Sequence, residues 1–300
     1  MNEFIDRLKQ FYRNGGMEVK IVFFTSLIFL VLELFFQINM LFKADYISRN
    51  FLQYTMLYSD PELLLYRPWT LITNIFLHAD FFHLLGNMLM VFYFGQLVRM
   101  FFNAKKVLAI FVIGGVAGGI LQILSKNIFP VFQDLGHYPI MGASGGAVAL
   151  VVAAALYRPQ TKLNLFGVVP VSLGIIAAVI VGIDFLNMGR LHGVARFAHI
   201  GGAIFGFLFT TQYKKGKDIT KWFDNLISWL VGLFSRKPKP RMKVKYSRAR
   251  DNKQQPPRDD YEYNENKVNN EEKLNVILDK IKKKGYDGLT KAEKDFLARQ

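Results

Sequence analysis

The sequence contains no cysteine, which excludes disulfide bonds and metal sites built from thiolates. Lys and Arg are also missing from residues 21–42, an apolar stretch long enough to cross a lipid bilayer. No run of small residues typical of a signal-peptide cleavage site follows that stretch. We therefore expect it to remain in the chain as a membrane-spanning helix.

The composition indicates a membrane protein with several spans. Hydrophobic residues make up 51% of the chain, and they cluster in long runs that carry few charges. The formal net charge of +15 is also found in proteins that bind nucleic acid. Here, however, Lys and Arg stand between the apolar runs and in the C-terminal tail, a distribution typical of membrane topology. We predict an all-α, polytopic membrane protein that contacts membrane lipid and binds no nucleic acid.

The apolar runs predict a bundle of six transmembrane helices. Their approximate ranges are 21–42, 80–102, 107–124, 142–157, 165–188 and 194–213. Asp80 is placed to cap the second helix. The sixteen residues of the fourth range correspond to about 24 Å of helix, less than the ~30 Å hydrocarbon core. Its first residues are therefore expected below the membrane surface, in a water-filled depression.

Polar segments flank the predicted membrane domain, which covers residues 21–213. Residues 1–20 form a basic cytoplasmic lead-in. Residues 271–300 form a small helical hairpin with a capping box at Thr290 and Glu293, although a solubilising tail is the simpler interpretation. Residues 214–270 connect the membrane domain to this hairpin. They hold an interfacial helix, a polybasic stretch that attracts anionic lipid and a flexible linker. These three parts cover 222–234, 236–250 and 251–270.

The basic residues predict that both termini are cytoplasmic, and we expect the inner membrane of a bacterium. In a six-span topology, four basic segments fall on one side: the N-terminal lead-in and residues 99–106, 158–162 and 214–217. The second, fourth and sixth helices then all enter the membrane from the outer face.

With this orientation, four polar side chains inside the spans lie near the outer surface. Ser144 opens the fourth span and His199 lies near the start of the sixth, while His83 and Asn87 lie one turn apart on one face of the second. Each alone could simply satisfy a neighbour in the bundle. Four at one depth indicate a site, because polar groups inside a membrane are costly and usually functional.

Small residues predict that the fourth and sixth spans touch. They repeat every four residues on both helices, at Gly145, Ala149 and Ala153 and at Ala198, Gly202 and Gly206. Such stripes let two backbones approach closely. Facing each other, they would bring the Ser144 Oγ within hydrogen-bond reach of the His199 imidazole.

The four polar residues predict nucleophilic catalysis. A serine hydroxyl needs a base to take its proton, and His199 is the candidate. The Ser144 backbone N–H, Asn87 and His83 would donate hydrogen bonds to the oxyanion that forms. No third carboxylate is evident, because Asp80 is explained as a helix cap and Asp184 as a residue at the outer end of the fifth span. We therefore predict that Ser144 and His199 act as a catalytic dyad.

These segments resemble the motifs of the rhomboid intramembrane serine proteases. His83-Leu-Leu-Gly-Asn87 is similar to the family's His-x-x-x-Asn, Gly142-Ala-Ser-Gly145 to its Gly-x-Ser-Gly, and Ala198-His-Ile-Gly-Gly202 with Gly206 to its final helix. The resemblance covers about residues 21–213. It implies a serine endopeptidase that cuts transmembrane proteins near the outer interface, with Ser144 and His199 as the dyad and Gly142 beside the substrate. It implies no cofactor and no metal.

Two positions depart from the family pattern. Many members carry Trp-Arg in the first loop, whereas this chain has Trp69-Thr70 there, with Arg67 behind Pro68. Some members place a Tyr four residues after the serine, where it stacks on the histidine, and here that position is Val148.

Three other functions fit parts of the sequence. Gly142-Ala-Ser-Gly-Gly146 matches the nucleophile elbow of soluble α/β-hydrolases, but that elbow follows a buried strand rather than a loop between spans. A non-catalytic membrane binder or chaperone on the same scaffold should lack the serine or the histidine, and both are present. A transporter should show broken helices or charges at the midplane, and neither is clear.

Overall fold

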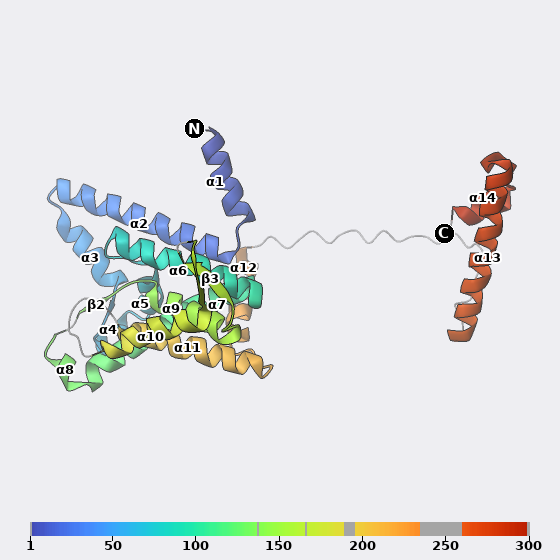
Figure 1. The fold of residues 1–300 in the computed structure, drawn as a ribbon. Coiled ribbons are helices and arrows are strands. Elements are labelled where there is room, and N and C mark those ends of the chain that lie inside the picture. Colours follow the sequence, from blue (N-terminus) through green and yellow to red (C-terminus); the bar gives the residue numbers. More distant parts are fainter. Residues whose placement is uncertain (1, 137, 166, 189–195, 235–259, 299–300) are drawn as a thin grey trace. The chain divides into compact units, whose positions relative to one another are not determined.

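The computed structural model of the protein describes residues 2–136, 138–165, 167–188, 196–234 and 260–298. The chain divides into two compact units, residues 1–237 and residues 238–300. The first unit holds the membrane helices and the second holds the helices near the C-terminus (Figure 1).

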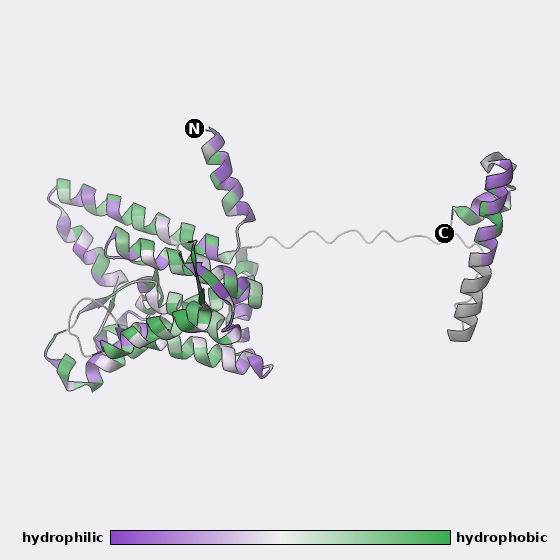
Figure 2. Cartoon of the chain, in the orientation of Figure 1, coloured by the Kyte–Doolittle hydropathy of each residue, from purple (hydrophilic) through white to green (hydrophobic). Residues whose placement is uncertain are grey.

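The first unit is a helical bundle, which confirms the predicted fold class. Its six main helices are α2 (Met17–Leu41), α6 (Phe81–Phe101), α7 (Ala104–Ile128), α9 (Ser144–Tyr157), α10 (Leu173–Leu186) and α11 (Arg196–Lys214). By length and composition α2, α6 and α7 can cross a membrane, and α9 and α10 are shorter apolar helices. Hydrophobic residues predominate along these helices (Figure 2). The amino ends of α6, α9 and α11 lie at one end of the bundle (Figure 1).

Helix α9 is the centre of the bundle. Every residue from Gly145 to Ala155 is buried, and α9 contacts α11, α7, α6 and α10. Its fourteen residues span about 21 Å, which is less than the ~30 Å hydrocarbon core. Helix α2 is the opposite case, because it exposes large apolar side chains such as Leu30 and Leu34. Such a surface suits contact with lipid.

The fifth span is shorter than the sequence predicts, and its expected start at residue 165 is wrong. Strands β3 (Lys162–Leu165) and β4 (Val169–Ser172) pair in antiparallel fashion, and α10 begins only at Leu173. Two local features favour this turn. Gly167 has a φ of 75°, which glycine adopts without strain, and Ser172 caps α10 by accepting a hydrogen bond from the Ile175 N–H at 3.4 Å.

The loop between α2 and α6 is built from short elements. They are α3 (Asp45–Thr55), β1 (Leu57–Tyr58), α4 (Pro61–Tyr66), α5 (Thr70–Thr73) and the 3₁₀ helix η1 (Asn74–Phe76). Despite the displaced arginine, this loop is anchored. Arg67 donates to the Gln53 carbonyl at 2.6 Å and stacks over the Tyr54 ring, and the Trp69 indole donates to the Tyr54 carbonyl at 2.8 Å. Arg67 and Trp69 thus tie the loop to α3.

A second connection supports the amino end of α9. After α7 come α8 (Pro130–Gln133) and β2 (Pro139–Ile140), and β2 pairs antiparallel with β1, with Leu57 opposite Ile140. Leu57 and Ile140 are both buried. The residues just before α9 are therefore held against the first loop.

A buried lysine joins the bundle to α12 (Lys221–Phe234), the helix expected at the interface. The Lys106 ammonium is 3% exposed and donates to Asp218 at 2.5 Å, to Asp224 at 2.6 Å and to Thr220 at 2.9 Å. Burial alone would raise the pKa of Asp218, but the hydrogen bonds from Lys106 and Thr220 outweigh it and hold that pKa below its ordinary value. The interfacial position of α12 stays a prediction, and the polybasic stretch 236–250 lies outside the described residues.

The C-terminal unit contains α13 (Asp260–Lys284), the 3₁₀ helix η2 (Tyr286–Gly288) and α14 (Lys291–Leu297). The flexible linker predicted for residues 251–270 is wrong from residue 260 onward, since α13 already begins there. The predicted capping box is present, with reciprocal hydrogen bonds between Thr290 and Glu293. Lys280, 2.8 Å from Glu293, lowers the pKa of that carboxyl to about 2 and links α13 to α14.

Replacing Lys106 tests how α12 is attached. In Lys106→Met the carboxylates of Asp218 and Asp224 face each other without a cation, and breaking a buried ion pair costs about 3 kcal/mol. We expect a clearly lower thermal midpoint in detergent. Lys105→Met is the matched control, because Lys105 is exposed and makes no ion pair among the described residues. Equal midpoints for the two variants would contradict the anchoring role.

Candidate active site

Ser144 is the first residue of α9 and lies at the end of a tight loop. Gly142 has a φ of 128° and donates its N–H to the Asn74 carbonyl at 3.0 Å. Among the described residues, the Ser144 backbone N–H has no hydrogen-bond partner, and no side chain caps α9. The first N–H groups of a helix are unpaired and carry the positive end of its dipole. The loop therefore presents a free donor next to the serine hydroxyl.

His83 and Asn87 face this loop from α6. A Cβ built on Gly142 would lie 2.9 Å from the His83 Cε1 and Nε2 atoms and 3.7 Å from the Asn87 Nδ2. Glycine is thus required at 142 both by its φ and by the close approach of the His83 ring. Asp80 sets the start of α6, because its carboxylate accepts from the His83 N–H at 2.9 Å, as the sequence predicts.

The Asn87 amide is the unusual polar group of the site. Its side chain is 3% exposed, and its Nδ2 has no hydrogen-bond partner among the described residues. Burying an unpaired donor costs about 1–3 kcal/mol, so native structures rarely do so without a reason. This Nδ2 donor lies near Gly142, which is two residues before Ser144 in the sequence. It is available to an oxygen atom that enters beside the loop.

Helix α11 is pressed against α9 by glycine contacts. A Cβ on Gly202 would overlap the Gly145 carbonyl, and one on Gly206 would lie 2.6 Å from the Ala149 carbonyl. At the site end, a Cβ on Gly145 would lie 3.1 Å from the carbonyl of Ala198. His199 follows Ala198, and Ser144 precedes Gly145. The two residues therefore lie on adjoining turns of touching helices.

The structure differs from the sequence prediction in how His199 is held. Its Nδ1 is 2.8 Å from the Asp184 Oδ2, and the other oxygen of Asp184 is 3.5 Å from Arg196. Asp184 lies at the end of α10, as predicted, but it is not an isolated end residue, because its carboxyl group contacts His199. Meanwhile, no hydrogen bond joins Ser144 Oγ to His199 within the described residues. Such bonds are often long before substrate binds.

Two further residues shape the site without any clear signal in the sequence. Gln122 on α7 accepts from the Ala198 N–H at 3.1 Å and donates to the Tyr138 hydroxyl at 2.9 Å, which fixes the first turn of α11. His78 accepts from the Ala143 N–H at 3.4 Å. Burial and the neighbouring His83 lower the pKa of His78 to about 4, so it stays a neutral acceptor near pH 7.

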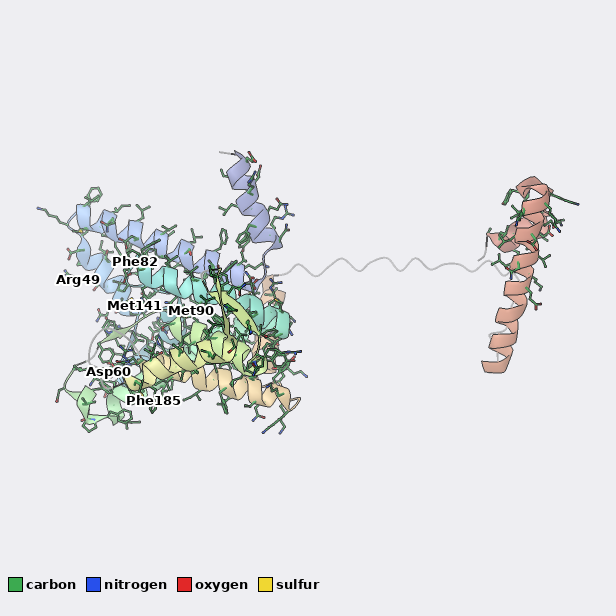
Figure 3. The ribbon with its side chains drawn as sticks, viewed as in Figure 1. Arg49, Asp60, Phe82, Met90, Met141 and Phe185 are labelled. Atoms are coloured by element: carbon green, nitrogen blue, oxygen red, sulfur yellow. The ribbon has the colours of Figure 1, made fainter. Side chains whose placement is uncertain are left out.

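All of these residues gather at one end of the membrane unit. Phe82, Met141 and Phe185 are each next in sequence to a site residue, and they lie toward the same end of the bundle, whereas Met90 lies farther along α6 (Figure 3). No cluster of His, Asp and Glu suited to a metal ion occurs in the described part of the chain. The arrangement brings together a hydroxyl, an imidazole with a carboxylate, and two unpaired N–H donors.

Comparison with known proteins assigns the chain to a family. Residues 66–215 match the rhomboid domain, which is half of the sequence, and the chain belongs to the rhomboid family. Members of this family are typically intramembrane serine proteases. Residues 259–299 match a family of unknown function, DUF6576, which coincides with the C-terminal helices.

Several relatives share the membrane domain. "RHOMBOID-like protein 7" of Arabidopsis thaliana is 33% identical over 164 residues, covering 55% of this chain and 48% of that protein. "RHOMBOID-like protein 12, mitochondrial" of the same plant is 25% identical over 161 residues, covering 50% and 48%. "Rhomboid-like protease 3" of Toxoplasma gondii is 25% identical over 160 residues, covering 53% and 57%. The chain thus spans about half the length of these relatives.

Substituting Gly202 tests the contact between α9 and α11. In Gly202→Val the side chain overlaps the Gly145 carbonyl and forces the helices apart, so we expect lower thermal stability and a loss of any activity that needs Ser144 beside His199. Gly182→Val on α10 is the control, because a Cβ there meets no atom within 4 Å. A Gly202→Val protein as stable as the control would show that the contact is unimportant.

Proposed function

We propose that this multi-pass membrane protein is an intramembrane serine endopeptidase that cleaves single-span transmembrane proteins near the outer membrane interface. One observation carries the proposal: the buried, unpaired amide of Asn87 and the free N–H of Ser144 lie beside the same loop. Donors left unpaired in a buried site are what an enzyme needs to stabilise a developing oxyanion. Family membership supports the same reaction.

The proposed reaction proceeds through an acyl-enzyme. The Ser144 oxygen attacks the scissile carbonyl carbon while its proton passes to the Nε2 of His199. The carbonyl oxygen becomes an oxyanion and accepts hydrogen bonds from the Ser144 N–H, Asn87 and His83. The C–N bond then breaks and His199 gives the proton to the leaving amine. Water repeats the sequence on the ester and releases the second product.

The proposed orientation places this chemistry near the outer surface. Both termini are cytoplasmic, the membrane is the inner membrane of a bacterium, and the amino ends of α6, α9 and α11 face outward. Because α9 is short, Ser144 lies below the surface, where water must reach it to complete hydrolysis. Substrate proteins and lipid are the partners. The alternative is a non-catalytic binder of membrane proteins, and the presence of both Ser144 and His199 argues against it.

Replacing the nucleophile or the base tests the proposal directly. We expect Ser144→Ala and His199→Ala each to abolish cleavage of a single-span reporter by protein purified in detergent, with the fold retained. The reason is that neither the attack nor the proton transfer has a substitute. Cleavage by purified Ser144→Ala would refute the assignment of Ser144 as the nucleophile. A wild-type chain that binds the reporter without cutting it favours the alternative.

Replacing the oxyanion donors tests the next step. Asn87→Ala and His83→Ala should lower kcat more than they raise KM, because the hydrogen bonds strengthen only as the oxyanion forms. Losing one such donor typically costs about 10²-fold in rate, and the loss is smaller where the Ser144 N–H compensates. Steady-state kinetics on the single and double variants measure this. If the double variant turned over at the wild-type rate, Asn87 and His83 would not stabilise the oxyanion.

The position of the cut tests the depth of the site. A peptide bond inside a helix is shielded by the next turn, so it must unwind before attack. Spans with Gly, Ala, Ser or Pro near the outer end unwind most easily. We expect the cut within the outer few residues of a substrate span, after a small residue, as mass spectrometry of the two fragments will show. A cut at the cytoplasmic end would overturn both the orientation and the site.

A further inference from the structure

A buried carboxylate joins two helices beside the proposed base. Asp184, near the end of α10, is 6% exposed, and its Oδ2 lies 2.8 Å from the Nδ1 of His199 on α11. Its Oδ1 lies 3.5 Å from the guanidinium of Arg196, one turn before His199. Each oxygen of Asp184 thus has its own partner, and both partners belong to α11.

This arrangement fixes which nitrogen of His199 carries the proton. An ionised carboxylate can only accept hydrogen bonds, so the Nδ1 must donate and the Nε2 is left unprotonated. Arg196 lies 3.5 Å from the other oxygen of Asp184, so this buried carboxyl group also has a cationic partner inside the bundle. An unprotonated Nε2 is the state in which an imidazole can take a proton from a serine.

The bond to Asp184 is the hydrogen bond that orients the His199 ring. His199 makes no other side-chain hydrogen bond and no aromatic contact in the described part of the chain. Val148, four residues after Ser144, is buried, but an aliphatic side chain cannot stack as an aromatic ring does. The tautomer and the orientation of His199 therefore depend on Asp184.

We propose that Asp184 is a positioning residue that completes a Ser144–His199–Asp184 triad, with Arg196 holding the carboxylate in place. The proposal rests on the proposed function for its catalytic consequence. Its structural content is separate: Asp184 keeps the proton of neutral His199 on Nδ1. When Ser144 gives up its proton to Nε2, the ring becomes an imidazolium, and the carboxylate stabilises that charge without taking the proton itself.

The tautomer can be measured without any catalysis. The chain has five histidines, so the ¹⁵N signals of His199 can be assigned by their loss in His199→Gln. We expect neutral His199 to be protonated on Nδ1 in the wild type and to become a mixture of tautomers in Asp184→Ala. Asp134→Asn, which removes an exposed carboxylate from another loop, is the control and should leave the spectrum unchanged. Identical His199 signals in Asp184→Ala and the wild type would overturn the proposal.

The rate of serine modification measures the catalytic consequence. A fluorophosphonate probe reacts with Ser144 only when the base accepts its proton. In Asp184→Asn, which keeps the size of the side chain, the amide can donate to Nδ1 and favour the wrong tautomer. We expect labelling and the kcat for a single-span reporter to fall by at least about tenfold, with KM little changed. The fall should not exceed the ~10²–10⁴-fold that general base catalysis contributes as a whole.

The outcomes separate this proposal from the proposed function. If the wild type neither labels nor cleaves, the endopeptidase assignment fails, and the ¹⁵N spectra still decide whether Asp184 fixes His199. If the wild type is active and Asp184→Asn labels and cleaves at the wild-type rate, the triad is wrong and the dyad stands. Arg196→Gln should reduce labelling less than Asp184→Asn does, since Asp184 keeps its bond to His199.

Discussion

The close approach of α9 to its neighbours is the constraint on which the structure depends. Cβ atoms on Gly114, Gly146 and Gly202 would overlap Ala149, Phe111 and Gly145 respectively, so α7, α9 and α11 meet backbone to backbone. In lipid the hydrophobic effect does not drive helices together, and tight van der Waals packing takes its place. Small residues make that packing achievable, and the resulting contacts also place Ser144 against the helix that carries His199.

Several buried polar groups are left unpaired at the site end of this packed core. Among the described residues, the buried side-chain atoms without a hydrogen-bond partner include atoms of His78, Asn87 and Arg196 there, besides Thr25 and Ser48 elsewhere. Asn87 is buried, and among the described residues neither its Nδ2 nor the first backbone amide of α9 has a hydrogen-bond partner. Their lost hydrogen bonds reduce the stability of the resting protein. In return, the donors are already oriented and need no rearrangement when charge develops on a substrate oxygen. This is the pattern expected of a site in which stability and activity compete.

The residues of the site come from four helices, and a different local interaction positions each helix. Asp80 caps α6 and sets the turn of His83, Gly142 bends the chain into α9, Gln122 holds the start of α11, and Asp184 comes from α10. Because Asp184 and His199 lie on different helices, the packing of α10 against α11 controls the orientation of the His199 imidazole ring. A change in that packing far from Ser144 would therefore alter the proposed reaction.

The sequence by itself determined the helical membrane fold, the approximate spans and the four polar residues at one depth. Hydropathy, helix capping and four-residue stripes are local properties, and they were sufficient for the cap at Asp80, the capping box at Thr290 and the contact between Gly145 and Gly202. Only the tertiary structure showed the hairpin before α10, the helical residues from 260 onward and the bond between Asp184 and His199. The sequence places the carboxyl group of Asp184 at the end of an apolar run, but it does not predict which side chain that group contacts. That contact depends on the rotation of α10 against α11, which is set by packing between residues distant in the chain rather than by any local pattern.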